Sequence, residues 1–201
     1  MKTSNKPHAP AVQHGPIDWR VLVGWLHEDG VISADEAART VARCASAQST
    51  LHPLQRLAVV GMARAADSHV LDVELLTQWM AKRAGLDYMR IDPLKVDVGK
   101  VADVMSAAYA ERHKVLPVLV SPNEVVVATA EPFVRDWVPE VERQTRRNVR
   151  LVIASPQAIS SFTGEFFALA KSVRAANKSG AQGFSSFEQL VELGKANKQL
   201  D

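Results

Sequence analysis

The string nearest to a phosphate-binding loop runs from Gly164 to Ser172. A mononucleotide P-loop has the spacing G-x-x-x-x-G-K-[S/T], because its glycines let backbone N–H groups surround the phosphates while the lysine reaches the terminal ones. Lys171 and Ser172 are present here, but Ala170 replaces the second glycine and the first glycine is one residue too far away. The same residues read as an amphipathic helix. We therefore predict no catalytic residue in this chain and no ATP hydrolysis by it.

Side chains that bind metals or act as nucleophiles are few and scattered. The six histidines include no pair at an i, i+4 spacing, and a single cysteine, Cys44, does not complete a zinc cluster. No G-x-S-x-G turn presents a serine nucleophile. Cys44 lies in a helical stretch, where it is expected as a small apolar side chain on the buried face. We predict no metal site and no cofactor on this chain.

The densest group of charges is a run of arginines near the end of a predicted helix, namely Arg143, Arg146, Arg147 and Arg150. Such a group can contact an acidic partner surface or anionic lipid headgroups. It is also the composition of a solvated helix end, since cations near a helix C-terminus interact favourably with the helix dipole. We take Arg143, Arg146 and Arg147 as candidate partner-binding residues.

The four tryptophans divide into two groups. Three of them lie on apolar stripes and are expected in the core: Trp25, Trp79 and Trp137. Trp19 lies off the stripe of the first predicted helix, next to the N-terminal tail. Because aromatic side chains are favoured at interfaces, Trp19 is the aromatic candidate for a partner contact.

Composition excludes several classes of protein. The 201 residues suffice for one domain or two small ones, and contents of 47% apolar and 23% charged residues are ordinary for a folded protein. No apolar run approaches the roughly 20 residues of a membrane-spanning helix, and the N-terminus lacks the apolar core of a secretory signal. The net charge of +2 gives no overall field that requires nucleic acid or anionic lipid. We expect a cytoplasmic protein, which agrees with the single cysteine.

The first 85 residues predict a helical lobe. Residues 1–16 hold three prolines and no apolar periodicity, which predicts a flexible tail. Over residues 17–85 apolar side chains recur at helical spacing, and capping and stop signals divide them into about four helices. The signals are Gly30, the capping box from Ser33 to Glu36, His52-Pro53, Asp72 and Gly85.

Residues 86–168 change to alternating strands and helices. The β-rich runs are 86–91, 115–120, 124–130 and 149–154, with helices around 101–109 and 133–141 and a hairpin turn at Ser121-Pro122-Asn123. The order β-α-β-β-α-β predicts a split βαβ, ferredoxin-like α/β lobe of three or four strands. Pro117 suggests an edge position for its strand. The predicted fold class is α+β, with a helical lobe followed by a small α/β lobe.

The last segment, residues 169–201, is predicted to be a linker that contains a helix. Residues 171–183 are small and polar, which is typical of a linker, whereas residues 184–193 have an amphipathic pattern. That pattern has no packing partner in the sequence, so we expect the chain to continue into a further domain.

Three strings in the middle of the chain resemble one known family. They are LLTQWMAKRAGLDYMRIDPL at residues 75–94, YAERHKVLPV at 109–118 and VVATAEPF at 126–133. In this order and spacing they resemble the N-terminal domain of type II secretion and type IV pilus assembly ATPases, the general secretion pathway protein E family. The resemblance covers residues 70–168 well and residues 17–70 loosely.

This resemblance implies a role and a partner. In the family, a nucleotide-binding core follows the N-terminal domain after a flexible linker, and it uses ATP and Mg²⁺ to drive pilus or pseudopilus assembly at the inner membrane. The N-terminal domain tethers that motor to the cytoplasmic part of an inner-membrane platform protein. The resemblance therefore implies a docking and regulatory domain that is peripheral to the inner membrane and has no nucleic-acid partner. The parent motor is expected to be hexameric through its other domains, and this fragment to be a monomer.

Some family members bind cyclic di-GMP through two tandem motifs of the form R-L-G-x-x-L-x-x-x-G-x-I. The candidate contact residues that this alternative implies here are Arg20, Leu22, Leu26 and Gly30. However, the arginine and the first glycine of the first motif fall on Val21 and Val23, and His69 stands at a glycine position of the second. The surviving positions are those of the apolar scaffold, so docking is the preferred reading and cyclic di-GMP sensing the alternative.

Overall fold

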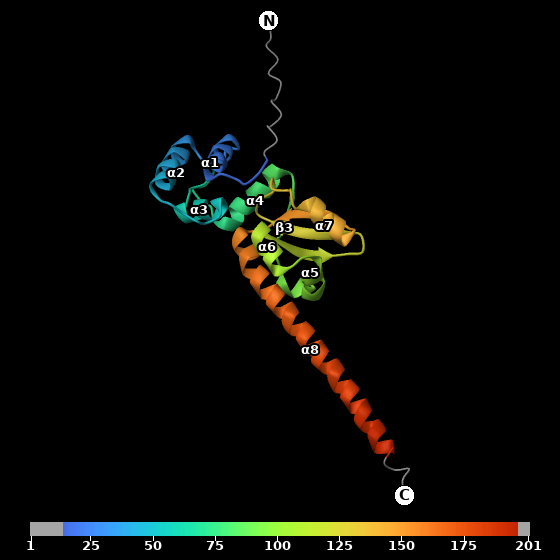
Figure 1. The fold of residues 1–201 in the computed structure, drawn as a ribbon. Helices are drawn as coiled ribbons and strands as arrows, with labels where there is room; N and C mark the ends of the chain where they lie inside the picture. The colour runs from blue at the N-terminus through green and yellow to red at the C-terminus, as the bar shows by residue number, and fades with distance from the viewer. Residues whose placement is uncertain (1–13, 197–201) are drawn as a thin grey trace.

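Two lobes and a projecting helix make up the fold (Figure 1). The structure is a computed structural model that describes residues 14–196, with side chains described for residues 14–178. Most of the predicted tail, residues 1–13, lies outside the described residues.

Four helices form the first lobe, and a side chain caps the first turn of each. They are α1 (Trp19–Glu28), α2 (Ala34–Ser46), α3 (Pro53–Val60) and α4 (Val73–Ala84). In the same order the caps are Asp18, Ser33, His52 and Asp72, whose side chains each accept a backbone N–H two or three residues ahead. The predicted helix starts at Ser33, His52-Pro53 and Asp72 are thus confirmed.

The two glycines that are predicted to end helices of this lobe are in the left-handed conformation, as is Gly61 at the end of α3. Gly30 has φ of 69° one residue after the C-cap Asp29 of α1, and Gly85 has φ of 66° at the end of α4. Residues other than glycine adopt this conformation at a cost, because Cβ then approaches the carbonyl oxygen. Both predicted stops are confirmed.

The core of the helical lobe consists of side chains at helical spacing. Those without any exposed surface are Leu22, Leu26, Leu54, Leu57, Met62, Leu76 and Met80. Cys44 is buried beside them, as predicted. Burial of each leucine contributes about 1.5–3 kcal/mol, so this cluster is the main stabilising term of the lobe.

A four-stranded mixed sheet forms the centre of the second lobe. Its strands are β1 (Asp87–Tyr88), β2 (Val115–Val120), β3 (Glu124–Thr129) and β4 (Asn148–Ile153), in the spatial order β1-β4-β3-β2. β4 is parallel to both β1 and β3, and β2 is antiparallel to β3. β2 lies at an edge, which confirms the position predicted from Pro117.

The strand pairing differs from the predicted ferredoxin-like arrangement, although the order of elements agrees. A split βαβ unit has another strand between the two strands that a helix joins. Here α7 (Val138–Thr145) joins β3 to β4, which are direct neighbours, while β1 and β2 lie at opposite edges. Six residue pairs, from Glu124 with Asn148 to Thr129 with Ile153, hold β3 and β4 in register and leave no room for an intervening strand. The α+β class is confirmed.

Helices cover both faces of this sheet, as the alternation of side chains along a strand requires. On one face Val126, Ala128 and Val152 pack against α5 (Val98–Val104) and α8 (Pro156–Ala196). On the other face Val125, Val127 and Leu151 pack against Trp137 and α7. Trp137 is 2% exposed, which confirms its predicted place in the core.

The predicted helix around residues 101–109 is two helices. α5 ends at Val104, and Ser106 caps α6 (Ala107–His113) by accepting the N–H of Tyr109. A serine side chain competes for backbone hydrogen bonds and favours a helix start over a helix interior. Before α5, a short 3₁₀ helix covers Pro93–Lys95.

α8 is a single helix of 41 residues. It begins at Pro156 after Ser155, packs on the sheet with its first turns, and then projects away from both lobes (Figure 1). Residues 171–183, which have the composition of a linker, are helical throughout. Within the described part of the chain, no helix has both the length and the apolarity to span a membrane.

Candidate functional site

The predicted arginine cluster lies where α7 ends and β4 begins. Arg143 is in the last turn of α7, and Arg146 follows the helix with φ of 54°, in the left-handed conformation. Both side chains are exposed, and neither has a hydrogen bond or ion pair with another described residue. Arg147 is half-buried, and its Nε donates to the carbonyl oxygen of Pro122 over 3.3 Å, which ties the cluster to the β2–β3 turn. Two guanidinium groups are therefore presented to solvent on a fixed backbone.

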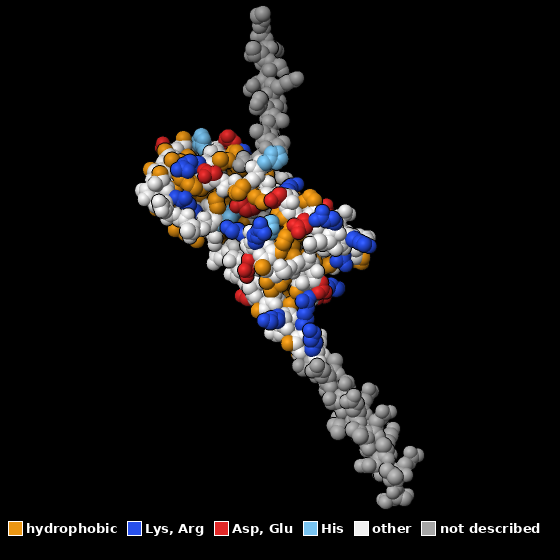
Figure 2. Space-filling view, in the orientation of Figure 1, with side chains coloured by type: hydrophobic (Ala, Val, Ile, Leu, Met, Phe, Trp, Pro, Cys, Tyr) orange, Lys and Arg blue, Asp and Glu red, His pale blue; other side chains and the backbone are white. Residues whose placement is uncertain are grey.

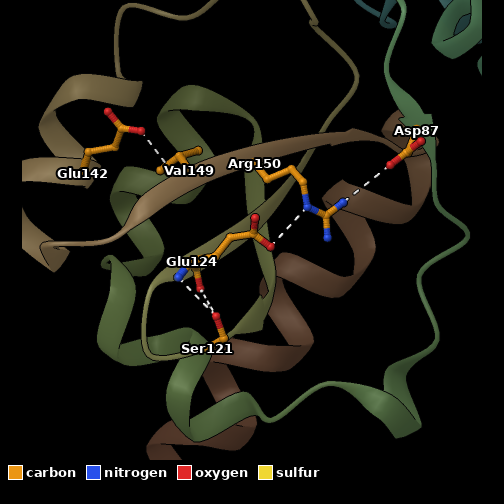
Figure 3. A network of polar contacts seen from close by, with 6 residues as sticks. All are labelled: Asp87, Ser121, Glu124, Glu142, Val149 and Arg150. Atoms are coloured by element: carbon orange, nitrogen blue, oxygen red, sulfur yellow. Dashed lines mark hydrogen bonds and ion pairs between the residues drawn. The ribbon is translucent and has the colours of Figure 1, made fainter.

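Arg150 is engaged in the sheet lobe rather than free (Figure 3). Its Nε lies 3.1 Å from Oε1 of Glu124, and a terminal nitrogen lies 3.6 Å from Oδ2 of Asp87. Glu124 is itself held by Ser121, whose hydroxyl accepts the backbone N–H of Glu124. The side chain thus links β4 to both neighbouring strands, so Arg150 stabilises the sheet and its charge is neutralised.

Lys and Arg side chains gather over α7 and beside the base of α8 in the view of Figure 2. Exposed arginines without an ion-pair partner can bind carboxylate or phosphate oxygens, because the planar guanidinium offers paired donors. The surface around Arg143 and Arg146 is therefore suited to an acidic partner.

Trp19 is not an exposed contact residue, so that prediction is wrong. It is 6% exposed and lies in the core of the helical lobe. α1 begins at Trp19 because Asp18 caps it, and this phase aligns Trp19 with Leu22 and Leu26 on the inner stripe. The guanidinium groups of Arg20 and Arg56 lie 4.4 Å and 4.9 Å from the Trp19 ring centroid.

The candidate cyclic di-GMP residues do not share one surface. Leu22 and Leu26 have no exposed surface, whereas Arg20 and Gly30 are exposed at opposite ends of α1. Arg20 rests on Trp19 and lies 3.9 Å from the carboxylate of Asp18. A ligand that contacts both leucines would require the core of the lobe to open.

A cavity of about 490 Å³ lies between the two lobes, and sequence reasoning missed it. Its polar lining residues are Thr50, His52, Gln55, Glu111, Lys114, Glu131, Ser160 and Thr163. At its wall, Nε2 of His52 lies 2.9 Å from Oε1 of Glu131. One sequence feature could have pointed to His52 and Glu131, because each directly precedes a proline. The two prolines mark the start of α3 and the start of the turn after β3. The lining mixes one lysine with two carboxylates, so its charges favour neither an anion nor a cation.

The pKa values of two half-buried tyrosines, Tyr88 and Tyr109, are raised above the usual value. Burial, together with a hydrogen bond from its hydroxyl to Glu140, raises the pKa of Tyr109 to about 12. Burial and a hydrogen bond to Glu74 also raise the pKa of Tyr88. Both remain neutral donors at physiological pH. Among the described residues, no group of three His, Cys, Asp or Glu side chains is placed to hold a metal ion.

Comparisons with known proteins find one family model and one curated relative. The model of the MshEN domain matches residues 84–173, which contain the sheet, α5 to α7 and the start of α8. The type IV pilus assembly ATPase TfpB of Acinetobacter baylyi (strain ATCC 33305 / BD413 / ADP1) is 33% identical over 186 residues. The match covers 90% of this chain and 32% of the relative, so the chain spans about a third of that protein's length.

Solved structures with a similar fold have low sequence identity. The structure of MshE with cdg superposes with a TM-score of 0.54 at 16% identity, covering 72% of this chain and 97% of that one. The N-terminal domain of XpsE gives a TM-score of 0.44 at 16% identity, over 71% of this chain and 91% of that one. The likeness to MshE concerns the fold.

Proposed function

We propose that this chain is the docking and regulatory domain of a type II secretion or type IV pilus assembly ATPase. The match of residues 84–173 to the MshEN domain and the 33% identity to the pilus assembly ATPase TfpB support this proposal. Its partner in this proposal is the cytoplasmic part of an inner-membrane platform protein, which holds the domain at the inner membrane. In this proposal, ATP and Mg²⁺ bind to the nucleotide-binding core of the parent protein and not to this domain.

The observation that carries the docking proposal is the pair of exposed arginines at the end of α7, Arg143 and Arg146, which form no ion pair with a described residue. Arg146 is held in the left-handed conformation, which costs a residue with a Cβ about 1–2 kcal/mol. Backbone strain of this kind is retained where the surrounding structure fixes it, and it is frequent at functional positions. The conformation lets the chain turn from α7 into β4 while both guanidinium groups stay exposed. An acidic surface on the platform protein fits this pair.

Binding of the platform protein's cytoplasmic domain to the purified 201-residue chain tests the proposal. Reversing both charges with Arg143→Glu and Arg146→Glu is expected to weaken binding about tenfold or more, since like charges then face each other across the interface. The matched control reverses two exposed cations elsewhere, Lys82→Glu and Arg112→Glu, and keeps the same net charge. The proposal is contradicted when the platform protein's cytoplasmic domain does not bind to the unmodified chain. It is also contradicted when the two double variants bind that domain equally well.

Cyclic di-GMP sensing by the helical lobe is the alternative function, and the fold shared with the structure of MshE with cdg favours testing it. In this alternative Arg20 and Gly30 are the accessible candidate contacts. A calorimetric titration of the chain with cyclic di-GMP decides the matter. Saturable heat that is lost in Arg20→Ala supports sensing, and the absence of heat at high ligand concentration leaves docking.

A further inference from the structure

A second surface suited to a partner lies along α8, where this helix leaves the sheet lobe. It is a groove of about 430 Å³ between α8 and the junction of α5 with α6, which we call the α8 groove. Its floor consists of small or apolar residues, namely Ala102, Met105, Ala107, Phe167 and Ala170. Alanine side chains leave space beside α8, so an apolar side chain of a partner can enter.

Three cations form the outer rim of the α8 groove. Lys171, Arg174 and Lys178 follow one another at i, i+3 and i+7, so they share one face of α8. All three side chains are exposed. Arg174 is paired with Asp103 of α5, whereas Lys171 and Lys178 have no ion pair with a described residue.

Charge and shape together indicate which partner fits the α8 groove. Among the described residues, its lining contains three cations and no acidic side chain. The two unpaired lysines are seven residues apart, which is roughly 10 Å along a helix. A partner helix packed along α8 can place two carboxylates, two turns apart, opposite these two lysines. Its apolar face then enters the groove. A flat lipid surface does not reach a recessed apolar floor in this way.

A smaller hollow lies between the α8 groove and the arginine cluster. This hollow of about 340 Å³ is lined by Arg147 and by Asp103, the partner of Arg174. Lys100, which is paired with Asp97, and residues of the β2–β3 turn complete its lining. The basic side chains therefore continue from the end of α7 to α8, and one partner can contact both ends.

We propose that the α8 groove binds an acidic amphipathic helix, with the partner's apolar side chains on the alanine-lined floor and its carboxylates on Lys171 and Lys178. This inference rests on the proposed docking function, because it assigns the helix to the same platform protein. Since α8 projects from the sheet lobe (Figure 1) and lines one side of the groove, the bound helix contacts both the sheet lobe and the projecting helix. Partner binding then fixes the direction in which α8 leaves the domain.

Two probes and two kinds of variant test the α8 groove in the full 201-residue chain. The probes are a fluorescent synthetic helix with glutamates on one face and leucines on the other, and the platform protein's cytoplasmic domain. Lys171→Glu with Lys178→Glu removes the charge complementarity, and Ala107→Leu fills the floor without changing charge. Each is expected to weaken binding of both probes about tenfold. The Lys82→Glu, Arg112→Glu control is expected to bind both probes like the unmodified chain.

The outcomes separate this inference from the proposed function. Binding of the platform domain that depends on Arg143 and Arg146 but not on either groove variant overturns the groove and leaves the docking function. Groove-dependent binding of the synthetic helix without any binding of the platform domain supports the groove and contradicts that docking function. Failure of the synthetic helix to bind overturns the groove. Capture on phosphatidylglycerol vesicles that requires Lys171 and Lys178, in place of helix binding, also overturns it and assigns the cations to lipid.

Discussion

Glu131 joins the sheet lobe to the helical lobe through His52, 79 residues earlier in the chain. Oε1 of Glu131 lies 2.9 Å from Nε2 of His52, and Oε2 accepts the backbone N–H of Ile17 over 2.9 Å. Because Nδ1 of His52 accepts the N–H of Leu54 at the start of α3, Nε2 carries the proton and donates it to Glu131. One carboxylate thus binds two separate points of the helical lobe.

The first prediction concerns Glu131→Gln. The two side chains are 7% exposed for His52 and 14% for Glu131, so neither is well solvated. A glutamine keeps one acceptor oxygen but turns an NH₂ group toward a second donor, which leaves a buried donor unsatisfied. We expect a loss of about 1–3 kcal/mol in the free energy of unfolding, measured by urea denaturation.

The matched control for this change is Glu124→Gln, which removes the same charge from the exposed pair with Arg150. There the side chains are 37% and 45% exposed, and we expect a loss below about 1 kcal/mol. Equal losses for the two variants would show that Glu131 does not act as a link between the lobes.

Features that depend on a few neighbouring residues could be predicted from the sequence. A helix cap at Asp72 or a stop at Gly85 is decided within one turn, so the signal is complete in a short string. The same holds for the β2–β3 hairpin and for the edge strand with Pro117. The resemblance to secretion and pilus ATPases rests on such strings, which explains why it could be recognised from the middle of the chain.

The second prediction compares two glycines that have open space around the position of an added Cβ. Gly24 lies inside α1 and Gly85 has φ of 66° at the end of α4, and neither would bring a Cβ within 4 Å of another atom. Gly24→Ala is therefore expected to stabilise the fold by about 0.5–1 kcal/mol through helix propensity. Gly85→Ala is expected to destabilise it by about 1–2 kcal/mol through backbone strain alone. Urea denaturation of both variants measures this, and a change of the same sign in both would contradict it.

Features that depend on contacts between distant segments could not be predicted. The His52–Glu131 hydrogen bond needs the tertiary arrangement of two lobes, and no local pattern encodes it. A helical periodicity that starts at Ile17 puts Trp19 off the apolar stripe, but Ile17 precedes the cap at Asp18 and lies outside α1. Arg150 is paired and Arg143 is not, because Arg150 lies beside Asp87 and Glu124 of the neighbouring strands. Both carboxylates are far from Arg150 in sequence, so a local pattern does not show these ion pairs.

The third prediction uses the shifted pKa of Tyr109. The folded-state pKa is about 12, and a tyrosine in an unfolded chain titrates near pH 10. Between these values the folded state keeps a proton that the unfolded state loses. The stability due to Tyr109 is therefore complete below about pH 10 and is lost as the pH rises through about 12.

Urea denaturation below and within this pH window, for the unmodified chain and for Tyr109→Phe, measures the effect of Tyr109. Without the phenol group the fall in stability with rising pH is expected to be shallower. Tyr88, whose pKa is also raised, stays in both proteins and serves as an internal reference. An identical pH dependence in the two proteins would contradict the assignment to Tyr109.

The last prediction concerns whether the two lobes unfold together. Phe133, from the segment after β3, packs edge-on against Trp25 of α1, with ring centroids 5.9 Å apart and planes at 75°. Aromatic pairs of this geometry contribute about 0.5–1.5 kcal/mol beyond their buried area. A double-mutant cycle with Trp25→Leu and Phe133→Leu is expected to show a coupling of that size. The cycle also corrects for the contact between Trp25 and the guanidinium of Arg83, because that contact is lost in both variants that change Trp25.

The control for this cycle combines Trp25→Leu with Phe162→Leu, which changes a ring of α8 stacked on Phe166. The effects of these two substitutions on the free energy of unfolding are expected to add within about 0.5 kcal/mol. Additive effects in the Trp25–Phe133 cycle, together with two separate unfolding transitions, would mean that the two lobes fold independently. Partner binding at the sheet lobe would then not change the stability of α1.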